Sequence, residues 1–253
     1  MRMGAIIRVF VDIGAHFGEC LVEVLKPTYH FDKIICIEPS SVAFDRLLRF
    51  HDTRIVLGNF GAWNEPGETI LYSTGAVGAS LYSDKPQIGN LSEKIELRDI
   101  KRFLDTQLSQ EDQVFCKLNA EGSEYEILKR IFESSINAWK IESILLSLDM
   151  SKVPSLRTRE EDFLKFLYKR NVNFSLRRKS DPAEAIQDWL ESQNVQENTS
   201  IREWIKYFFS VPIWLHVRKV TRNFIPRNIW IFLALRFGPN RIRNKTNCRG
   251  TTE

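Results

Sequence analysis

The feature that most constrains this chain is an apolar run near its N-terminus that ends in an acid and two glycines. It reads Val9-Phe10-Val11-Asp12-Ile13-Gly14-Ala15-His16-Phe17-Gly18. The β-branched residues predict a strand, the glycines predict a tight turn, and the residues that follow predict a helix start. Glycine lets the backbone approach a ligand closely, and a helix N-terminus offers free N–H groups. The pattern therefore predicts a ligand site at the carboxyl end of a strand.

A second apolar run, residues 33–37, ends in Glu38. A carboxylate at the end of a neighbouring strand is well placed to accept hydrogen bonds from the two hydroxyls of a ribose, so a nucleoside site is expected there. Dinucleotide enzymes usually carry G-x-G-x-x-G, whereas this chain has D-x-G-x-x-x-G. Asp12 would repel a diphosphate. It suits a cationic ligand, and S-adenosylmethionine carries both an ammonium and a sulfonium group.

Strand-like and helix-like runs alternate along the chain. Further strands are expected at residues 54–57, 69–72, 113–118, 141–148 and 172–176. This alternation predicts an α/β fold with a doubly wound, mostly parallel sheet and a site at the strand ends. Residues 73–91 form a long predicted loop with three glycines, and loops of this length in a compact domain are often functional.

Charge is distributed unevenly and suggests the domain organisation. Residues 151–253 hold 20 Lys and Arg against 10 Asp and Glu, whereas residues 1–150 hold 16 against 22. We predict a ligand-binding domain at 1–180, a polar linker with one short helix at 181–200, and a basic, aromatic C-terminal extension at 201–253. Such a basic tail indicates an anionic partner, either a membrane or a nucleic acid.

Cysteine and histidine usage indicates an intracellular protein without a structural metal. Cys20, Cys36, Cys116 and Cys248 show no C-x-x-C spacing, so buried reduced thiols and a cytoplasmic location are expected. His30, His51 and His216 have no ligand spacing with cysteines or carboxylates, which predicts no metal site. No signal peptide is visible, and no apolar run approaches the roughly 20 residues that span a bilayer.

Five short motifs in one order resemble a known family. The sequence shows D-x-G-A-x-x-G, I-E-P, N-x-G-A-W, A-S-L and K-x-N-x-E-G-x-E, which is similar to the FkbM-type S-adenosylmethionine-dependent methyltransferases. The likeness covers about residues 9–150, with weaker likeness to about residue 178. It implies a class I methyltransferase fold, with a Rossmann-like, mostly parallel seven-stranded sheet. It also implies methylation of hydroxyl groups, often on sugars, glycans or natural products.

The resemblance also implies site residues, by position in these motifs. The cofactor-binding residues would be Asp12, Gly14, Ala15, Gly18, Glu38, Asn59, Gly61 and Ala62. The last three lie where the edge of the adenine is usually met. Lys117, Glu121, Gly122 and Glu124 match the family's K-x-D-x-E-G-x-E block.

The chain departs from the family at Asn119, where an aspartate is usual. Alternation along the strand places Phe115, Lys117 and Asn119 on one side, so Asn119 should face the reactive end of the cofactor. An amide can orient a hydroxyl but cannot act as a general base. Three hypotheses follow: Glu121 or His16 supplies the base, the reaction needs only positioning, or catalysis has been lost. The catalytic candidates are thus Asn119, Glu121, Lys117 and His16.

Each of these residues also has a purely structural interpretation. Glu124 is favoured in a first helical turn by the helix dipole, and Ser123 before it is a candidate helix cap. Lys117 could reach solvent or pair with Glu121. His16 could be an ordinary loop residue. Trp63 could cover the adenine or pack in the core.

The extension at 201–253 combines aromatic clusters with basic residues. Its apolar stretches are too short to span a bilayer, so an interfacial element on an anionic, peripheral membrane surface is one hypothesis. A lid helix or a homodimer contact is the second, and nucleic-acid binding is a weaker third because no binding fold accompanies the charge.

The function expected from the sequence is O-methylation of a hydroxyl on a sugar, glycan or glycolipid-like acceptor. The alternatives are a catalytically silent S-adenosylmethionine-binding module and an NAD-dependent oxidoreductase, which the glycine spacing disfavours.

Overall fold

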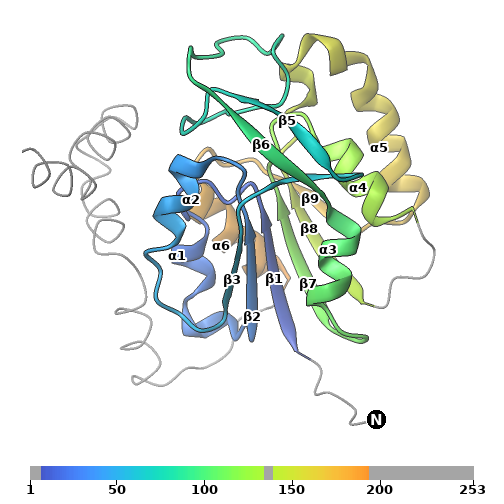
Figure 1. The fold of residues 1–253 in the computed structure, drawn as a ribbon. Helices are drawn as coiled ribbons and strands as arrows, with labels where there is room; N and C mark the ends of the chain where they lie inside the picture. Colours follow the sequence, from blue (N-terminus) through green and yellow to red (C-terminus); the bar gives the residue numbers. More distant parts are fainter. Residues whose placement is uncertain (1–6, 134–138, 194–253) are drawn as a thin grey trace, which may run out of the picture. The chain divides into compact units, whose positions relative to one another are not determined.

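A parallel sheet with helices on both faces forms the centre of the molecule (Figure 1). The computed structural model describes residues 7–133 and 139–193. Within them the central sheet has six strands, all parallel, in the order β3-β2-β1-β7-β8-β9. Its strands are β1 (Arg8–Ile13), β2 (Lys33–Ile37), β3 (Ile55–Gly58), β7 (Gln113–Leu118), β8 (Lys140–Leu146) and β9 (Phe174–Leu176).

The chain builds this sheet outwards in two directions. From β1 it moves to β2 and β3 on one side, and from β7 it moves to β8 and β9 on the other. The order therefore reverses between β1 and β7. In doubly wound sheets, ligands bind outside the carboxyl ends of the strands at such a reversal. The predicted α/β, Rossmann-like fold is thus confirmed, although the described residues give six strands to the central sheet where seven were expected.

The described residues also form six α-helices and three short 3₁₀ helices. The α-helices are α1 (Leu21–Val24), α2 (Ser41–Leu47), α3 (Ile100–Gln107), α4 (Glu124–Ile131), α5 (Glu160–Lys169) and α6 (Pro182–Ser192). The 3₁₀ helices are η1 (Pro27–Tyr29), η2 (Met150–Lys152) and η3 (Pro154–Arg159).

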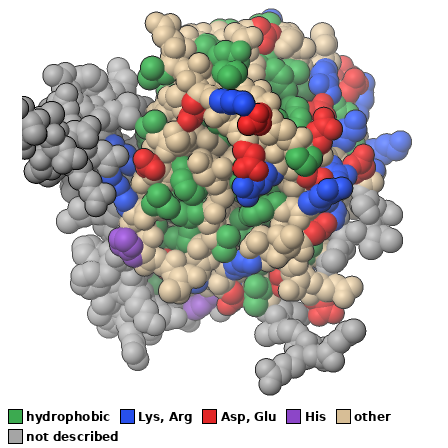
Figure 2. All heavy atoms as spheres, viewed as in Figure 1, with side chains coloured by type: hydrophobic (Ala, Val, Ile, Leu, Met, Phe, Trp, Pro, Cys, Tyr) green, Lys and Arg blue, Asp and Glu red, His purple; other side chains and the backbone are tan. Residues whose placement is uncertain are grey.

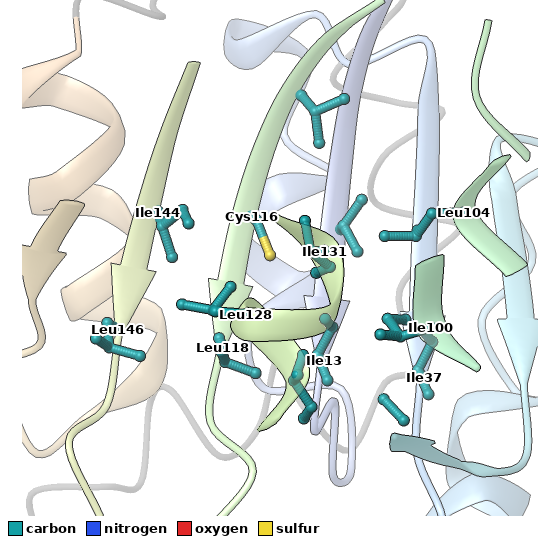
Figure 3. Packing of buried hydrophobic residues seen from close by; sticks show 14 of the residues in the cluster. Ile13, Ile37, Ile100, Leu104, Cys116, Leu118, Leu128, Ile131, Ile144 and Leu146 are labelled. Carbon is teal, nitrogen blue, oxygen red and sulfur yellow. The ribbon is translucent and has the colours of Figure 1, made fainter. Parts of the chain in front are cut away.

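The larger core lies between the sheet and helices α3, α4 and α5. Alternate residues of β1 and β7 point into it, and Leu128 and Ile131 of α4 pack above Cys116 and Leu118 (Figure 3). These strands read as nearly continuous apolar runs because helices bury both faces of a parallel sheet.

Aromatic side chains cover the opposite face of the sheet, and one of them, Trp189, comes from helix α6. Trp189 lies 6.4 Å from Phe10 and 6.2 Å from Phe115, measured between ring centroids. Its indole nitrogen donates to Ser143 Oγ at 3.1 Å. Residues 182–192 are therefore part of the folded domain. The predicted boundary at residue 180 and the assignment of 181–200 as a linker are wrong for this segment, because its apolar side chains complete a core.

A second, three-stranded sheet was not predicted. It pairs β4 (Gly61–Trp63) with β6 (Ser92–Asp99) in parallel, and β6 with β5 (Gly67–Tyr72) in antiparallel. In β6 only every second residue is buried, and charged residues occupy most of the positions between. Such a strand has one solvated face, which hides it in a search for apolar runs.

The extension at 201–253 and the end of the predicted linker lie outside the described residues. None of the described helices is long and apolar enough to cross a membrane. On the face drawn in Figure 2, basic and acidic side chains intermingle on the right-hand side and form no patch of one sign there.

Candidate functional site

The loops that follow β1 and β7 touch at the point where the strand order reverses. Gly14 has a φ of +78°, and a Cβ atom at this position would lie 2.0 Å from the carbonyl oxygen of Asn119. The N–H groups of Gly14 and Ala15 both donate to the carbonyl of Ile37, at 2.9 and 3.1 Å, which ties this turn to the end of β2. Only glycine tolerates both the left-handed conformation and the close approach.

Gly18, the second glycine of the motif, serves the packing of the turn. Its φ is +83°, and a Cβ atom would lie 2.6 Å from the ring of Phe50. The helix predicted after this turn begins later than expected. Residues 16–20 form turns, and α1 begins only at Leu21 and spans four residues. The N–H groups of a well-formed helix N-terminus are therefore absent from the described part of this loop.

A buried ion pair joins the ends of β1 and β7. Asp12 is fully buried, and its Oδ1 accepts a hydrogen bond from Lys117 Nζ at 2.8 Å. Lys117 Nζ also donates to the Gly14 carbonyl at 2.5 Å. Burial acts to lower the pKa of Lys117, but the Asp12 carboxylate outweighs it and holds the pKa above its usual range. Lys117 thus neither reaches solvent nor pairs with Glu121, the two structural alternatives that the sequence suggested.

Glu38, the predicted ribose-binding acid, lies at the end of β2 and is held by two backbone groups. Its Oε2 accepts from His16 N at 2.8 Å and its Oε1 from Ser40 N at 2.9 Å. Burial raises the pKa of Glu38, although His16 and these two hydrogen bonds oppose the rise. Asn59 lies next to it, because Asn59 Nδ2 donates to the Glu38 carbonyl at 2.9 Å.

Gly61 and Ala62 contribute to packing. Both belong to β4, where a Cβ atom at Gly61 would lie 2.6 Å from Leu97 and where Ala62 is part of the main core. Trp63, the next residue, packs partly buried against the smaller cluster of the second sheet. This contact agrees with the core-packing interpretation of Trp63.

His16 has an unusual backbone and a carboxylate partner. Its φ is +50°, in the left-handed region that non-glycine residues seldom adopt. Its Nδ1 lies 3.1 Å from Glu19 Oε1 and 3.3 Å from Oε2. Burial acts to lower the pKa of His16, but Glu19 and Glu38 outweigh it and raise the pKa. Glu19 was not among the predicted residues, and its spacing of three from His16 was the only signal for it.

Glu121 is tied to the long loop at 73–91. Its Oε2 lies 2.5 Å from Lys85 Nζ, and its backbone carbonyl accepts from Ser80 Oγ at 2.7 Å. Glu121 also adopts a left-handed backbone, with φ of +51°. The predicted loop therefore packs against the segment after β7, and the carboxylate of Glu121 already has a cationic partner.

Glu124 organises the backbone of that same segment. It is fully buried and accepts hydrogen bonds from Ala120 N at 3.1 Å and Gly122 N at 3.0 Å. Burial raises the pKa of Glu124 to about 8, and Asp149 adds to the rise. The structural interpretation of Glu124 is favoured by these contacts. Ser123, the predicted cap of α4, makes no capping hydrogen bond with its side chain.

Three buried polar atoms at this site lack a hydrogen-bond partner among the described residues. They are Asp12 Oδ2, His16 Nε2 and Asn119 Oδ1. Asn119 follows β7 directly, and its backbone N–H donates to the carbonyl of Ile13 at 3.0 Å. Most buried polar groups in proteins are paired, so several unpaired atoms from neighbouring loops indicate a place for a polar ligand.

The cysteines and potential metal ligands lie as follows. Cys20, Cys36 and Cys116 are buried and carry free thiols, whose pKa values burial and the nearby Asp12 raise. Their predicted burial is confirmed, whereas Cys248 lies outside the described ranges. In the described part of the chain, no group of three or more His, Cys, Asp or Glu side chains is arranged to hold a metal ion.

We compared the chain with protein-family models, curated proteins and solved structures. No protein-family model matches it, and neither does any curated protein. The chain is similar to the crystal structure of methyltransferase FkbM from Methylobacillus flagellatus KT, with 24% sequence identity and a TM-score of 0.34. The similarity covers 51% of this chain and 30% of that one, so the chain spans under a third of the length of the protein that it matches.

Proposed function

We propose that this chain is an S-adenosylmethionine-dependent methyltransferase that acts on a hydroxyl group. The observation that carries this proposal is that three buried atoms without partners, Asp12 Oδ2, His16 Nε2 and Asn119 Oδ1, belong to the ends of β1 and β7 and the loop after β1, where the strand order reverses. Polar atoms without partners at a reversal of strand order are typical of a preformed site for a small ligand.

The charges around these atoms favour a cationic ligand. Asp12, Glu19 and Glu38 are all buried, and Lys117, which pairs with Asp12, balances only one of these three acids. A diphosphate would meet these acids, and the four-residue α1 offers it little help from a helix dipole. The arrangement therefore supports S-adenosylmethionine over NAD.

The proposal assigns a role to each group. Glu38 would hold the ribose hydroxyls, with Asn59 beside the nucleoside, while Asp12 and Asn119 would face the charged end. The bound cofactor supplies a methyl group on a sulfonium centre that leaves as a neutral thioether. Alignment of the acceptor and exclusion of water then provide much of the catalysis.

The acceptor would enter beside the segment after β7. Residues 73–91 contact that segment through Lys85 and Ser80, which both bond to Glu121. An acceptor held there would lie next to the Asn119 amide, which can accept a hydrogen bond from a hydroxyl. The family resemblance implies that this hydroxyl belongs to a sugar, glycan or glycolipid-like molecule.

A catalytically silent cofactor-binding module is the second candidate. Asn119 cannot take a proton, and of the two predicted bases, Glu121 and His16, the Glu121 carboxylate is already paired with Lys85 at 2.5 Å. Under this alternative the pocket residues remain and methyl transfer is absent. Asn119→Asp discriminates the two: the variant should keep or raise turnover of an active enzyme, whereas a protein active only as the aspartate variant is a silent module.

Calorimetric titration tests the ligand assignment. Wild-type protein is titrated with S-adenosylmethionine, S-adenosylhomocysteine and NAD. Asp12→Asn and Glu38→Gln should weaken S-adenosylmethionine binding roughly 5- to 150-fold, equivalent to about 1–3 kcal/mol for a lost charged hydrogen bond. Glu68→Gln, at an exposed acid of the second sheet, is the matched control. Unchanged affinity in both site variants, or preferential binding of NAD, would contradict the assignment.

A methyl-transfer assay tests the reaction. Isotope-labelled S-adenosylmethionine is incubated with panels of sugars, glycans and glycolipids, and label in the acceptor is counted. Transfer by the wild type supports an enzyme. Cofactor binding without transfer to any acceptor supports the silent module.

A further inference from the structure

The His16 side chain is held by a carboxylate on one side only. Glu19 contacts Nδ1 through both of its oxygens, at 3.1 and 3.3 Å, and is itself fixed by the Phe17 N–H, which donates to Oε2 at 3.2 Å. A carboxylate at Nδ1 favours the neutral imidazole that carries its proton on Nδ1. The lone pair is then on Nε2.

Nε2 is the ring nitrogen that Glu19 does not contact. It is buried and has no hydrogen-bond partner among the described residues. The backbone of His16 is anchored separately, because its N–H donates to Glu38 at 2.8 Å. The strained left-handed conformation of His16 is thus fixed at the backbone by Glu38 and at the ring by Glu19. Strain that is held in place at two points is typical of functional positions.

We propose that His16 is the general base of this site, through Nε2, and that Glu19 is the positioning residue that orients it. The inference rests on the proposed function. In the step, the O–H bond of the acceptor breaks and its proton moves to His16 Nε2. The oxygen's electron pair forms the bond to the transferred methyl carbon, and the sulfur of the donor keeps the electron pair of the broken C–S bond.

The other candidate bases are already engaged. Glu121 forms an ion pair with Lys85, Glu124 is fully buried and bonded to backbone N–H groups, and Lys117 is a cation paired with Asp12. This leaves His16 as the one member of the predicted catalytic set that combines an oriented ring with a free lone pair. A hydroxyl acceptor is the substrate class that needs such a base.

The surroundings of His16 also define the competing role for Nε2. The charged groups that act on the His16 ring are Glu19, Glu38 and Lys117. Two of these three groups are acids, which makes a bound anion unfavourable, so we expect the partner of Nε2 to be a proton donor. That donor is the acceptor hydroxyl under our proposal, and the ammonium group of the cofactor under the alternative.

The experiment compares wild type, His16→Asn, Glu19→Gln and the exposed-site control His51→Gln in the full chain. Nitrogen NMR of the imidazoles, assigned with the two histidine variants, reports tautomer and pKa without any turnover. We expect the neutral His16 ring to carry its proton on Nδ1, and Glu19→Gln to lower its pKa. A His16 ring protonated on Nε2, or a pKa unmoved in Glu19→Gln, would overturn the pairing.

Kinetics and binding separate the remaining outcomes. We expect His16→Asn to lower kcat by roughly 10²–10⁴-fold, the usual contribution of a general base, with little change in the Kd for S-adenosylmethionine. The rise of kcat with pH should disappear in His16→Asn and shift to lower pH in Glu19→Gln, while His51→Gln behaves as wild type. A large rise in Kd with unchanged kcat would overturn the base in favour of the ammonium anchor.

Failure of the proposed function would look different. If the wild type binds no S-adenosylmethionine, the function and the base are both rejected, whatever the NMR shows. If the wild type binds it and transfers methyl groups while His16→Asn retains full kcat and an unchanged pH profile, the function stands and the base alone is rejected.

Discussion

The buried pair of Asp12 and Lys117 allows a quantitative test of whether Lys117 has a structural role. Lys117→Met keeps most of the volume of the side chain and removes its charge. Asp12 would then remain fully buried without a cation, and the Gly14 carbonyl would lose the donor that now lies 2.5 Å away. Both losses fall on the turn that forms the candidate site.

The expected magnitude follows from the separation of the charges. At the observed 2.8 Å, an effective dielectric constant of about 20 gives an attraction of about 6 kcal/mol. Desolvation of the two ions offsets several kcal/mol of this, and removing one partner of a buried pair typically costs about 3–5 kcal/mol. We therefore expect Lys117→Met to lower the free energy of unfolding by about 3–5 kcal/mol. The double variant Asp12→Asn/Lys117→Met should recover part of the stability that Lys117→Met loses, with a coupling energy of about 1–3 kcal/mol between the two positions.

Urea unfolding followed by circular dichroism measures these changes. Lys94→Met is the matched control, because Lys94 and Glu68 form an ion pair at 2.6 Å whose side chains are both 64% exposed. Exposed pairs contribute less than about 1 kcal/mol. Equal effects of the two lysine substitutions, or additive effects of the two substitutions at the buried pair, would refute the reasoning. Normal stability with lost turnover would instead restore the catalytic role that the sequence suggested for Lys117.

Three further predictions concern other parts of the chain. Gly14→Ala should lower the free energy of unfolding by more than about 2 kcal/mol, from left-handed strain and the clash with Asn119, and a loss below about 0.5 kcal/mol in urea unfolding would contradict it. The pKa of Glu124 is about 8 against an ordinary 4.5, so the folded state binds this proton more tightly and wild-type stability should fall as the pH rises between these values. In Glu124→Gln the part of this loss of stability that comes from Glu124 should be absent. If the urea midpoints of wild type and Glu124→Gln depend on pH in the same way, the contribution of Glu124 is excluded. We also propose that the basic tail binds anionic membranes, so the full chain should co-sediment with anionic liposomes in a salt-sensitive way. Changing the four basic residues within 241–249 to Gln should weaken that association, and unchanged sedimentation would favour the lid, dimer or nucleic-acid hypotheses.

The central sheet could be predicted because its strands rest on local patterns. Strands β1, β2 and β7 are buried on both faces, so their apolar runs are nearly continuous. Asp12 is the penultimate residue of β1, Glu38 and Asn119 directly follow β2 and β7, and the parallel arrangement brings these ends to one edge. Alternation within β7 also placed Lys117 correctly on the face that carries Phe115.

The missed features depend on contacts between distant parts of the chain. The pairing of Lys117 with Asp12 spans 105 positions and needs the register of β1 and β7. The pair of Lys85 with Glu121 needs the path of a long loop, which composition does not determine. A short helix was expected within the predicted linker, but the polar residues around it gave no sign that it packs on the sheet, and its place beside Phe10 and Phe115 explains why it is buried.

The three buried thiols allow local opening of the sheet around Asp12 to be measured by their rate of chemical modification. Cys20, Cys36 and Cys116 all lie close enough to Asp12 for its charge to raise their pKa, and none of them is exposed. An alkylating reagent can reach them only when this region opens, so the rate of modification reports the free energy of opening. With Cys248 changed to Ser, mass spectrometry would follow three internal positions in one reaction. A ligand that binds at the candidate site around Asp12 should slow all three together, which provides a screen for ligands that requires no knowledge of the acceptor.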